Sequence, residues 1–247
     1  MTPDDRRTDI LALAADGQAL SVDALAEQFG VSRETVRRDL ARLGEAGLLR
    51  RVHGGAAPAK TAAELPFQER RLQNAEAQRR IGHCAAGLFA AGDTLMIDTG
   101  STTEAFAAAL AGAAVTVITN SLRIASHLPQ SAVVLGGSFR PESGQLLGPM
   151  TVAASQQFSA DHAVLGVGAI SIEHGASDYD LEEAALASSM IGQARQVTLL
   201  ADHTKFGRRV LVRICRLRPM LRIVTNKELE SQLAAALKAM GVELIIA

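Results

Sequence analysis

The sequence predicts an α/β protein in which a small, mainly helical N-terminal domain precedes a larger domain built on a parallel sheet. Three observations predict it. Short helical segments fill the first 50 residues, residues 54–66 are rich in alanine, glycine and proline, and seven apolar runs then alternate with helical segments. The predicted boundaries are 1–57 for the first domain, 58–66 for a linker and 67–247 for the second domain.

The N-terminal domain is predicted to contain three helices. The first covers residues 4–16, and the second covers residues 21–30 and ends at a glycine turn. The third begins after Ser32, whose hydroxyl suits the N-cap position, and ends at Gly47. Two short helices joined by a glycine turn are typical of a helix-turn-helix, whose second helix enters the major groove of DNA.

The charged side chains of the third helix point away from its apolar face. Val36, Leu40 and Leu43 share one inward stripe, and Arg38 lies almost opposite to it. A salt-bridged surface helix would carry similar charges, but the glycine turn before it and the basic extended segment, or wing, after it favour DNA binding. The residues predicted to contact DNA are Ser32, Arg33, Glu34, Thr35, Arg37, Arg38 and Arg42 on the helix, and Arg50, Arg51 and His53 on the wing.

The basic charge of the chain is local. The formal net charge is -1, which argues against a generally basic nucleic-acid binder. Residues 33–53, however, hold six arginines and three acidic residues, whereas the first thirty residues hold two arginines and six acidic residues. This separation is expected of a protein that places one helix and one wing on DNA phosphates.

Composition argues against several other functions. No apolar run is long enough to cross a membrane, and the N-terminus lacks the apolar region of a secretion signal, so we expect a cytoplasmic protein with no membrane partner. The two cysteines, Cys84 and Cys215, lack metal-ligand spacing, and we predict no metal and no cofactor. Aromatic residues make up 3% of the chain, which is too few for a surface that binds single-stranded nucleic acid by stacking on its bases.

The second domain is predicted to form a largely parallel sheet after a helical stretch over residues 67–91. Most of its apolar runs are continuous, as in strands buried on both faces. The predicted strands are 94–98, 115–119, 132–136, 163–167, 197–201, 222–225 and 242–246, and the helices between them include 104–110, 182–194 and 227–240. Ligands of such sheets bind at the carboxyl ends of the strands.

Glycine and hydroxyl-bearing residues follow several of these strands. The loop after the first strand leads into a helix, where backbone amides and the positive helix end could hold a phosphate, although an ordinary capped turn has the same composition. A converging anion site explains the whole set most simply. The predicted effector-binding residues are Asp98, Gly100, Ser101, Thr102, Thr103, Asn120, Ser121, Gly136, Gly137 and Lys205.

The acidic run at residues 178–183 has two interpretations. Its carboxylates could serve acid–base chemistry or a metal, or they could lie at a helix N-terminus, where the helix dipole favours them. No histidine stands at metal-ligand spacing, so we discount a metal. We predict that Asp180 is an N-cap and that Glu183 completes a capping-box-like pattern.

Six segments carry a resemblance to a known family. They are V-S-R-E-T-V-R-R-D-L (31–40), L-L-R-R-V-H-G-G-A (48–56), I-D-T-G-S-T-T (97–103), V-I-T-N-S-L (117–122), L-G-G (135–137) and A-D-H-T-K-F-G (201–207). Through them the chain resembles the DeoR family of bacterial transcription regulators along nearly its whole length. The resemblance implies a winged helix-turn-helix followed by an α/β sensor domain related in fold to ribose-5-phosphate isomerase.

The resemblance also implies a function. Members typically bind a phosphorylated sugar or polyol and repress the operon for its catabolism, and the segments 178–183 and 201–208 look most like those of glycerol-3-phosphate repressors. Members often carry lysine where Ala187 stands and aspartate where Asn226 stands. The first departure removes a cation that could meet the charge of the effector.

The predicted function is therefore a DNA-binding repressor that binds double-stranded operator DNA and a phosphorylated sugar or polyol, best guessed as glycerol 3-phosphate. We expect a homo-oligomer, a dimer or tetramer, because one winged domain reads too few base pairs. One alternative is a sugar-phosphate isomerase-like enzyme with Asp178, Asp180 or Glu182 as base; a full catalytic set cannot be assembled, so no catalytic residue is predicted. Another is a first domain that binds a protein.

Overall fold

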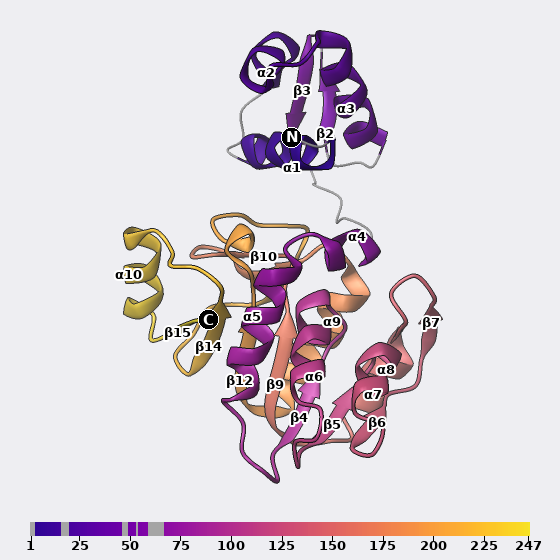
Figure 1. The fold of residues 1–247 in the computed structure, drawn as a ribbon. Helices are drawn as coiled ribbons and strands as arrows, with labels where there is room; N and C mark the ends of the chain where they lie inside the picture. Colours follow the sequence, from indigo (N-terminus) through magenta and orange to yellow (C-terminus); the bar gives the residue numbers. More distant parts are fainter. Residues whose placement is uncertain (1–2, 16–19, 46–48, 53, 59–66) are drawn as a thin grey trace. The chain divides into compact units, whose positions relative to one another are not determined.

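The computed structural model describes residues 3–15, 20–45, 49–52, 54–58 and 67–247. The chain divides into two compact units, an N-terminal unit of residues 1–65 and a C-terminal unit of residues 66–247 (Figure 1). Of the predicted linker at 58–66, only residue 58 lies within the described part of the chain, at the end of a strand. No described helix is long and apolar enough to cross a membrane.

The described residues of the N-terminal unit form three helices and a three-stranded antiparallel sheet of order β1-β3-β2. Residues 54–58 have the composition of a loop, yet most of them form a strand that pairs with both neighbours, so the wing is a hairpin. The elements are α1 (Pro3–Ala15), β1 (Leu20–Ser21), α2 (Val22–Phe29), α3 (Arg33–Glu45), β2 (Leu49–Val52) and β3 (Gly55–Pro58).

The predicted inward stripe of the third helix is confirmed. Val36, Leu40 and Leu43 are buried in the core of this unit. The predicted N-cap is also present, because the Thr35 N–H donates to Ser32 Oγ at 3.1 Å. The predicted helix end at Gly47 lies outside the described residues.

The C-terminal unit is built on a seven-stranded parallel sheet of order β15-β14-β12-β9-β4-β5-β6. All seven predicted strands are present, with their ends shifted by up to three residues. Their bounds are β4 (Thr94–Ile97), β5 (Thr116–Thr119), β6 (Ala132–Val134), β9 (Ala160–Gly166), β12 (Ala194–Leu200), β14 (Leu221–Thr225) and β15 (Glu243–Ile246).

Helices cover both faces of this sheet (Figure 1). The predicted helical stretch over 67–91 is broken at Asn74, whose φ of 59° is left-handed and incompatible with a continuous helix. The helices are α4 (Phe67–Leu72), α5 (Ala75–Ala86), α6 (Ser101–Ala109), α7 (Leu122–His127), α8 (Pro149–Ser155), α9 (Leu181–Gly192) and α10 (Ser231–Ala239), with a short 3-10 turn, η1 (His203–Lys205).

Five further strands, none of them predicted, form smaller sheets. Strands β7 and β8 form an antiparallel hairpin that lies between β6 and α8 in the chain. A three-stranded antiparallel sheet has the order β10-β11-β13. The bounds are β7 (Ser138–Arg140), β8 (Gln145–Leu147), β10 (Ala169–Ser171), β11 (Gly175–Asp178) and β13 (Val212–Cys215).

Neighbouring residues of β4 show why its apolar run is continuous. Leu95 and Ile97 pack into the core beneath α5 and α6, whereas Met96 packs into the core on the other face, beneath α9. Successive side chains of a strand point to opposite faces, so both faces of this strand need apolar residues.

We predict that Gly82→Ala destabilises the C-terminal unit. Gly82 lies on α5 where it meets α6, and an added Cβ would lie 2.7 Å from the backbone carbonyl carbon of Ala105. Because backbone cannot yield as a flexible side chain does, the free energy of unfolding should fall by about 1–3 kcal/mol. Urea unfolding followed by circular dichroism measures this change.

Gly192→Ala is the matched control, because an added Cβ at this end of α9 would meet nothing within 4 Å. It should leave stability unchanged or raise it slightly, since alanine favours helix more than glycine does. Equal stability of the two variants would show that α5 and α6 do not require glycine at their contact.

Candidate functional site

The order of the large sheet reverses between β4 and β9. From β4 the chain continues outward through β5 and β6, whereas from β9 it continues in the opposite direction through β12, β14 and β15. Open α/β sheets bind ligands outside the carboxyl ends of the strands at this switch point. Asp98 directly follows β4, and Gly166 ends β9.

Asp98 joins the ends of these two strands. The Gly166 N–H donates to both carboxyl oxygens of Asp98, at 2.9 and 3.1 Å. The Thr103 hydroxyl in turn donates to the Asp98 carbonyl oxygen at 2.9 Å, which fixes the loop between the strand and α6. The carboxyl group is therefore held at the switch point by the Gly166 amide, and the backbone of Asp98 is held by Thr103.

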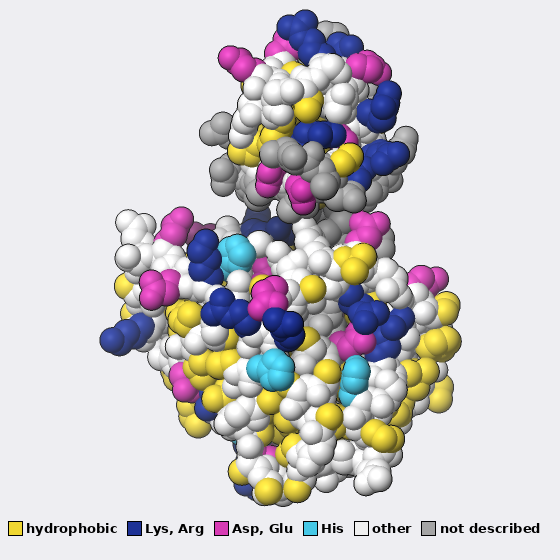
Figure 2. Space-filling model, viewed as in Figure 1, with side chains coloured by type: hydrophobic (Ala, Val, Ile, Leu, Met, Phe, Trp, Pro, Cys, Tyr) yellow, Lys and Arg dark blue, Asp and Glu magenta, His cyan; other side chains and the backbone are white. Residues whose placement is uncertain are grey.

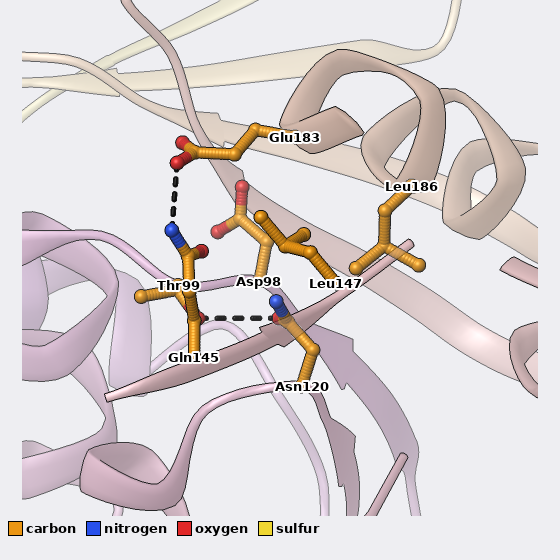
Figure 3. Close-up of a pocket in the computed structure, with 7 residues that line it drawn as sticks. All are labelled: Asp98, Thr99, Asn120, Gln145, Leu147, Glu183 and Leu186. Carbon is orange, nitrogen blue, oxygen red and sulfur yellow. Dashed lines mark hydrogen bonds between the residues drawn. The ribbon is translucent and has the colours of Figure 1, made fainter. Parts of the chain in front are cut away.

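A pocket opens beside this carboxyl group (Figure 3). Four separate segments line it: the loop after β4, the end of β5, the strand β8 and the first turns of α9. The lining residues are Asp98, Thr99, Asn120, Gln145, Leu147, Glu183 and Leu186.

Hydrogen bonds within the pocket orient its polar side chains. Gln145 Nε2 donates to Glu183 Oε1 at 2.7 Å, and the Thr99 hydroxyl donates to Asn120 Oδ1 at 3.3 Å (Figure 3). Asn120 Nδ2 donates to the Leu146 carbonyl oxygen at 3.1 Å, which ties β5 to β8. The two carboxamides are thus fixed in orientation before any ligand enters.

The electrostatics of Asp98 are unusual. Burial raises the pKa of its carboxyl to about 7 from the ordinary value of 3.8. The Gly166 N–H and the Thr103 hydroxyl oppose this rise, as does the Arg70 charge, whereas the Glu183 carboxylate adds to it. The pocket therefore contains one carboxyl that gains or loses its proton near neutral pH.

Arg140 attaches the β7–β8 hairpin to the start of α9. Its Nη1 lies 3.0 Å from Asp180 Oδ2 and 3.7 Å from Glu183 Oε1, and its Nη2 pairs with Glu182. The arginine ties the hairpin, which supplies Gln145 and Leu147, to the helix that supplies Glu183 and Leu186.

Asp180 is the N-cap of α9, as predicted. Its Oδ1 accepts from the N–H groups of Glu182 and Glu183, at 2.8 and 3.1 Å. Burial opposes ionisation of Asp180, but the Arg140 hydrogen bond and charge, together with these amides, lower its pKa below the ordinary value. The Glu183 carboxylate, predicted to complete a capping box, contributes to the pocket wall and accepts from Gln145.

Two of the predicted effector-binding residues, Asp98 and Asn120, line the pocket. Gly100 is the N-cap of α6, and Ser101 and Thr102 follow it in the first turn, beside Thr103. Ser121 caps α7 by accepting from the Ile124 N–H, and Lys205 ends η1. Gly136 and Gly137 precede β7, and an added Cβ at Gly137 would lie 2.0 Å from Thr151 Oγ1.

Five lining residues were not predicted as site residues: Thr99, Gln145, Leu147, Glu183 and Leu186. Glu183 belongs to the acidic run at residues 178–183, but the sequence pattern predicts helix capping for that run and gives no separate indication of a ligand site. Gln145 stands in a segment that carried no predicted element. Among the described residues, no group of three or more histidine, cysteine, aspartate or glutamate side chains is placed to hold a metal ion.

The second candidate site is the outer face of α3, where Arg33, Glu34, Arg37, Arg38 and Arg42 are exposed and Thr35 is half-buried. Basic side chains lie on the surface of this unit (Figure 2).

Ion pairs distinguish the arginines of α3. Arg33 Nε lies 2.7 Å from Asp23 Oδ1 of α2, and Arg37 Nη1 lies 3.7 Å from Glu34 Oε2. Within the described part of this unit, Arg38 and Arg42 make no ion pair. Arg50 and Arg51 lie on β2, where only their backbone is described, and His53 is outside the described residues.

Comparisons with known proteins cover both units. The family model of the DeoR-like helix-turn-helix domain matches residues 6–62, and that of the DeoR C terminal sensor domain matches residues 73–227. The chain is 32% identical over 251 residues to the HTH-type transcriptional repressor CsqR of Escherichia coli (strain K12), covering 100% of this chain and 96% of the relative.

Other relatives include the glycerol-3-phosphate regulon repressors of Escherichia coli (strain K12) and Haemophilus influenzae. The first is 33% identical to the chain and covers 86% of both sequences. The second is 36% identical and covers 85% of this chain and 84% of the relative. Among solved structures, ribose 5-phosphate isomerase A from Methanocaldococcus jannaschii has a TM-score of 0.41 at 16% identity, covering 54% of this chain and 55% of that one.

We predict that Asp98→Asn changes how stability depends on pH. Between about pH 4 and pH 7 the folded protein keeps a proton on Asp98 that the unfolded chain has released. The free energy of unfolding of the wild type therefore falls as pH rises through that window, because the proton that favours the folded state is lost. An amide does not titrate, so the variant should gain stability relative to the wild type from pH 5 to pH 8, as measured by urea unfolding.

Glu142→Gln, at an exposed carboxyl in the turn of the β7–β8 hairpin, is the control and should keep the wild-type slope. If Asp98→Asn followed the wild type in parallel across this range, the Asp98 carboxyl would not be titrating in the folded state.

Proposed function

The chain belongs to the DeoR family of transcriptional regulators, and on that premise we propose that it is a repressor of a carbohydrate or polyol catabolic operon controlled by a phosphorylated sugar or polyol. The observation that carries the proposal is the polar pocket at the switch point of the C-terminal unit. It has the location of a ligand site in this class of sheet and the chemistry to hold hydroxyl groups.

The pocket favours a small, hydroxyl-rich effector. Seven described residues from four short segments line it. Carboxyl, carboxamide and hydroxyl side chains in its wall can donate to and accept from ligand hydroxyls. As the effector we propose glycerol 3-phosphate, supported by relatives named glycerol-3-phosphate regulon repressors.

We place the phosphate of the effector at the N-terminus of α6, next to the pocket. Gly100 caps this helix without a side-chain hydrogen bond, and Ser101, Thr102 and Thr103 form its first turn. Amides at a helix N-terminus attract phosphate because the helix dipole is positive there. Ser121, Gly136, Gly137 and Lys205 remain proposed effector contacts on neighbouring segments.

On the DNA side, we propose that α3 enters the major groove and the β2–β3 wing contacts the backbone. Arg38 and Arg42 are the proposed base or phosphate contacts on α3, with Arg50 and Arg51 on the wing. A dimer or tetramer would supply the second half-site that specific recognition needs. The effector must bind the DNA-competent and DNA-incompetent states with different affinities, since otherwise it cannot shift their populations.

An isomerase-like enzyme is the second candidate, favoured by one observation. The pKa of Asp98 lies near 7, where a general base works best. Relatives that cover most or all of the chain are, however, named transcriptional repressors or transcriptional regulators, which supports the regulator.

We predict that Arg38→Ala weakens operator binding. If Arg38 reads a guanine, its loss should cost about 1–3 kcal/mol, or roughly 5- to 150-fold in Kd. Gel shift or fluorescence anisotropy on the upstream region of its own operon measures the change. Arg195→Ala removes the same charge at an exposed site of the C-terminal unit and should leave Kd unchanged. An Arg38→Ala protein that binds like the Arg195→Ala protein would exclude Arg38 as a DNA contact.

We predict that a phosphorylated sugar or polyol raises the Tm of the full chain, because a ligand that prefers the native state stabilises it by about 2.7 kcal/mol at 100 times its Kd. Asn120→Ala should lose this shift relative to its own ligand-free Tm. Gln157→Ala, an exposed amide after α8, should keep it. The absence of any shift across a panel of sugar and polyol phosphates would contradict the sensor assignment.

A further inference from the structure

We propose that the pocket recognises a hydroxyl group at the end of the effector opposite its phosphate and rejects a carboxylate there. The protein would then respond to phosphorylated alcohols and not to the corresponding phosphorylated acids. This inference rests on the proposed function, because it assumes that the pocket is the effector site, and it deepens that function by naming the class of effector.

The charges of the pocket carry the inference. Asp98 and Glu183 are among the seven described lining residues, and none of the seven is lysine, arginine or histidine. Figure 3 shows the two carboxyl groups facing the same space. A ligand carboxylate placed there would face the Glu183 charge and the buried Asp98 carboxyl with no cation among these lining residues, and juxtaposed like charges oppose binding.

The nearby arginines do not supply the missing cation. Arg140 is paired with Asp180 and Glu182 as well as with Glu183, so three acidic side chains share its charge. Arg70, on α4, lowers the pKa of Asp98 through its charge, but it is not among the lining residues of the pocket, and its guanidinium lies over the Phe67 ring at 5.4 Å.

A hydroxyl group suits the same position. It can donate to a carboxylate and accept from an amide N–H at once, whereas a ligand carboxylate can only accept. Glu183 and Gln145 present this combination, since Gln145 Nε2 already donates to Glu183 Oε1 and a carboxylate has about four acceptor positions. A site built for a hydroxyl rejects analogues that leave its polar groups unpaired.

Burial strengthens the discrimination. It already raises the pKa of Asp98 to about 7, which shows that the pocket environment disfavours one negative charge. A second anion from the ligand would add to this penalty. Repulsion of the wrong ligand is thus combined with attraction of the right one, and specific sites commonly use both.

Matched pairs of ligands test the inference on the full chain by isothermal titration calorimetry. The pairs are glycerol 3-phosphate with 3-phosphoglycerate, in which the alcohol end becomes an acid, and glucose 6-phosphate with 6-phosphogluconate, in which the hemiacetal end becomes an acid. For any pair that binds, the acid should bind at least about tenfold more weakly.

Glu183→Gln should narrow the ratio between alcohol and acid, because it removes one charge while the carboxamide oxygen that it introduces can still accept from Gln145. Glu228→Gln, at an exposed glutamate, should keep the wild-type ratio. The ligand-free Tm shows whether each variant is folded. If Glu183→Gln does not fold, the ratio between alcohol and acid measured on the wild type tests the inference by itself.

The outcomes separate the two proposals. An acid that binds the wild type as tightly as its partner, or a folded Glu183→Gln protein with an unchanged ratio, overturns the inference and leaves the effector role standing. Failure of every phosphate in the panel, alcohol and acid alike, overturns the proposed effector site, and the inference with it.

Discussion

The hydrogen bonds from the Gly166 N–H to the Asp98 carboxyl hold the centre of the C-terminal unit. They connect the ends of β4 and β9, between which the strand order reverses, and a parallel sheet leaves a gap at such a reversal. The Asp98 side chain lies at this reversal and is buried there, and burial raises the pKa of its carboxyl to about 7. Every other pocket residue approaches this fixed carboxyl from a loop, the hairpin or α9.

A buried ion pair has a comparable role in the N-terminal unit. Arg6 of α1 and Asp39 of α3 are both almost fully buried, and Arg6 Nε lies 2.7 Å from Asp39 Oδ2. Breaking such a pair by removing one partner is strongly destabilising. In a count of charges along the sequence, Asp39 cancels one arginine of α3. In the structure the Asp39 carboxylate is buried and paired with Arg6 instead. The outer face of α3 is therefore more positive than the sequence tally indicates.

Sequence patterns predicted the large sheet because its strands are buried on both faces, as Leu95, Met96 and Ile97 show. They did not predict the short antiparallel strands, which have three or four residues and no continuous apolar run, nor the break at Asn74. Asp98 and Asn120 could be identified because they directly follow strands. Glu183 and Gln145 could not, because their contact joins residues 38 positions apart through a hairpin that only tertiary packing defines.

The pocket consists of two halves with different freedom to change during evolution. Asp98 and Asn120 directly follow strands of the large sheet, and their side chains bond to the Gly166 N–H at the end of β9 and to the Leu146 carbonyl oxygen of β8. Gln145 and Leu147 belong to a hairpin that is attached to α9 by surface ion pairs of Arg140. Substitutions in this hairpin or in the first turns of α9 can alter the shape and polarity of the pocket while the sheet stays intact. Substitutions at these few positions could therefore change which small molecule the pocket accepts, while the fold and the DNA-binding unit stay unchanged.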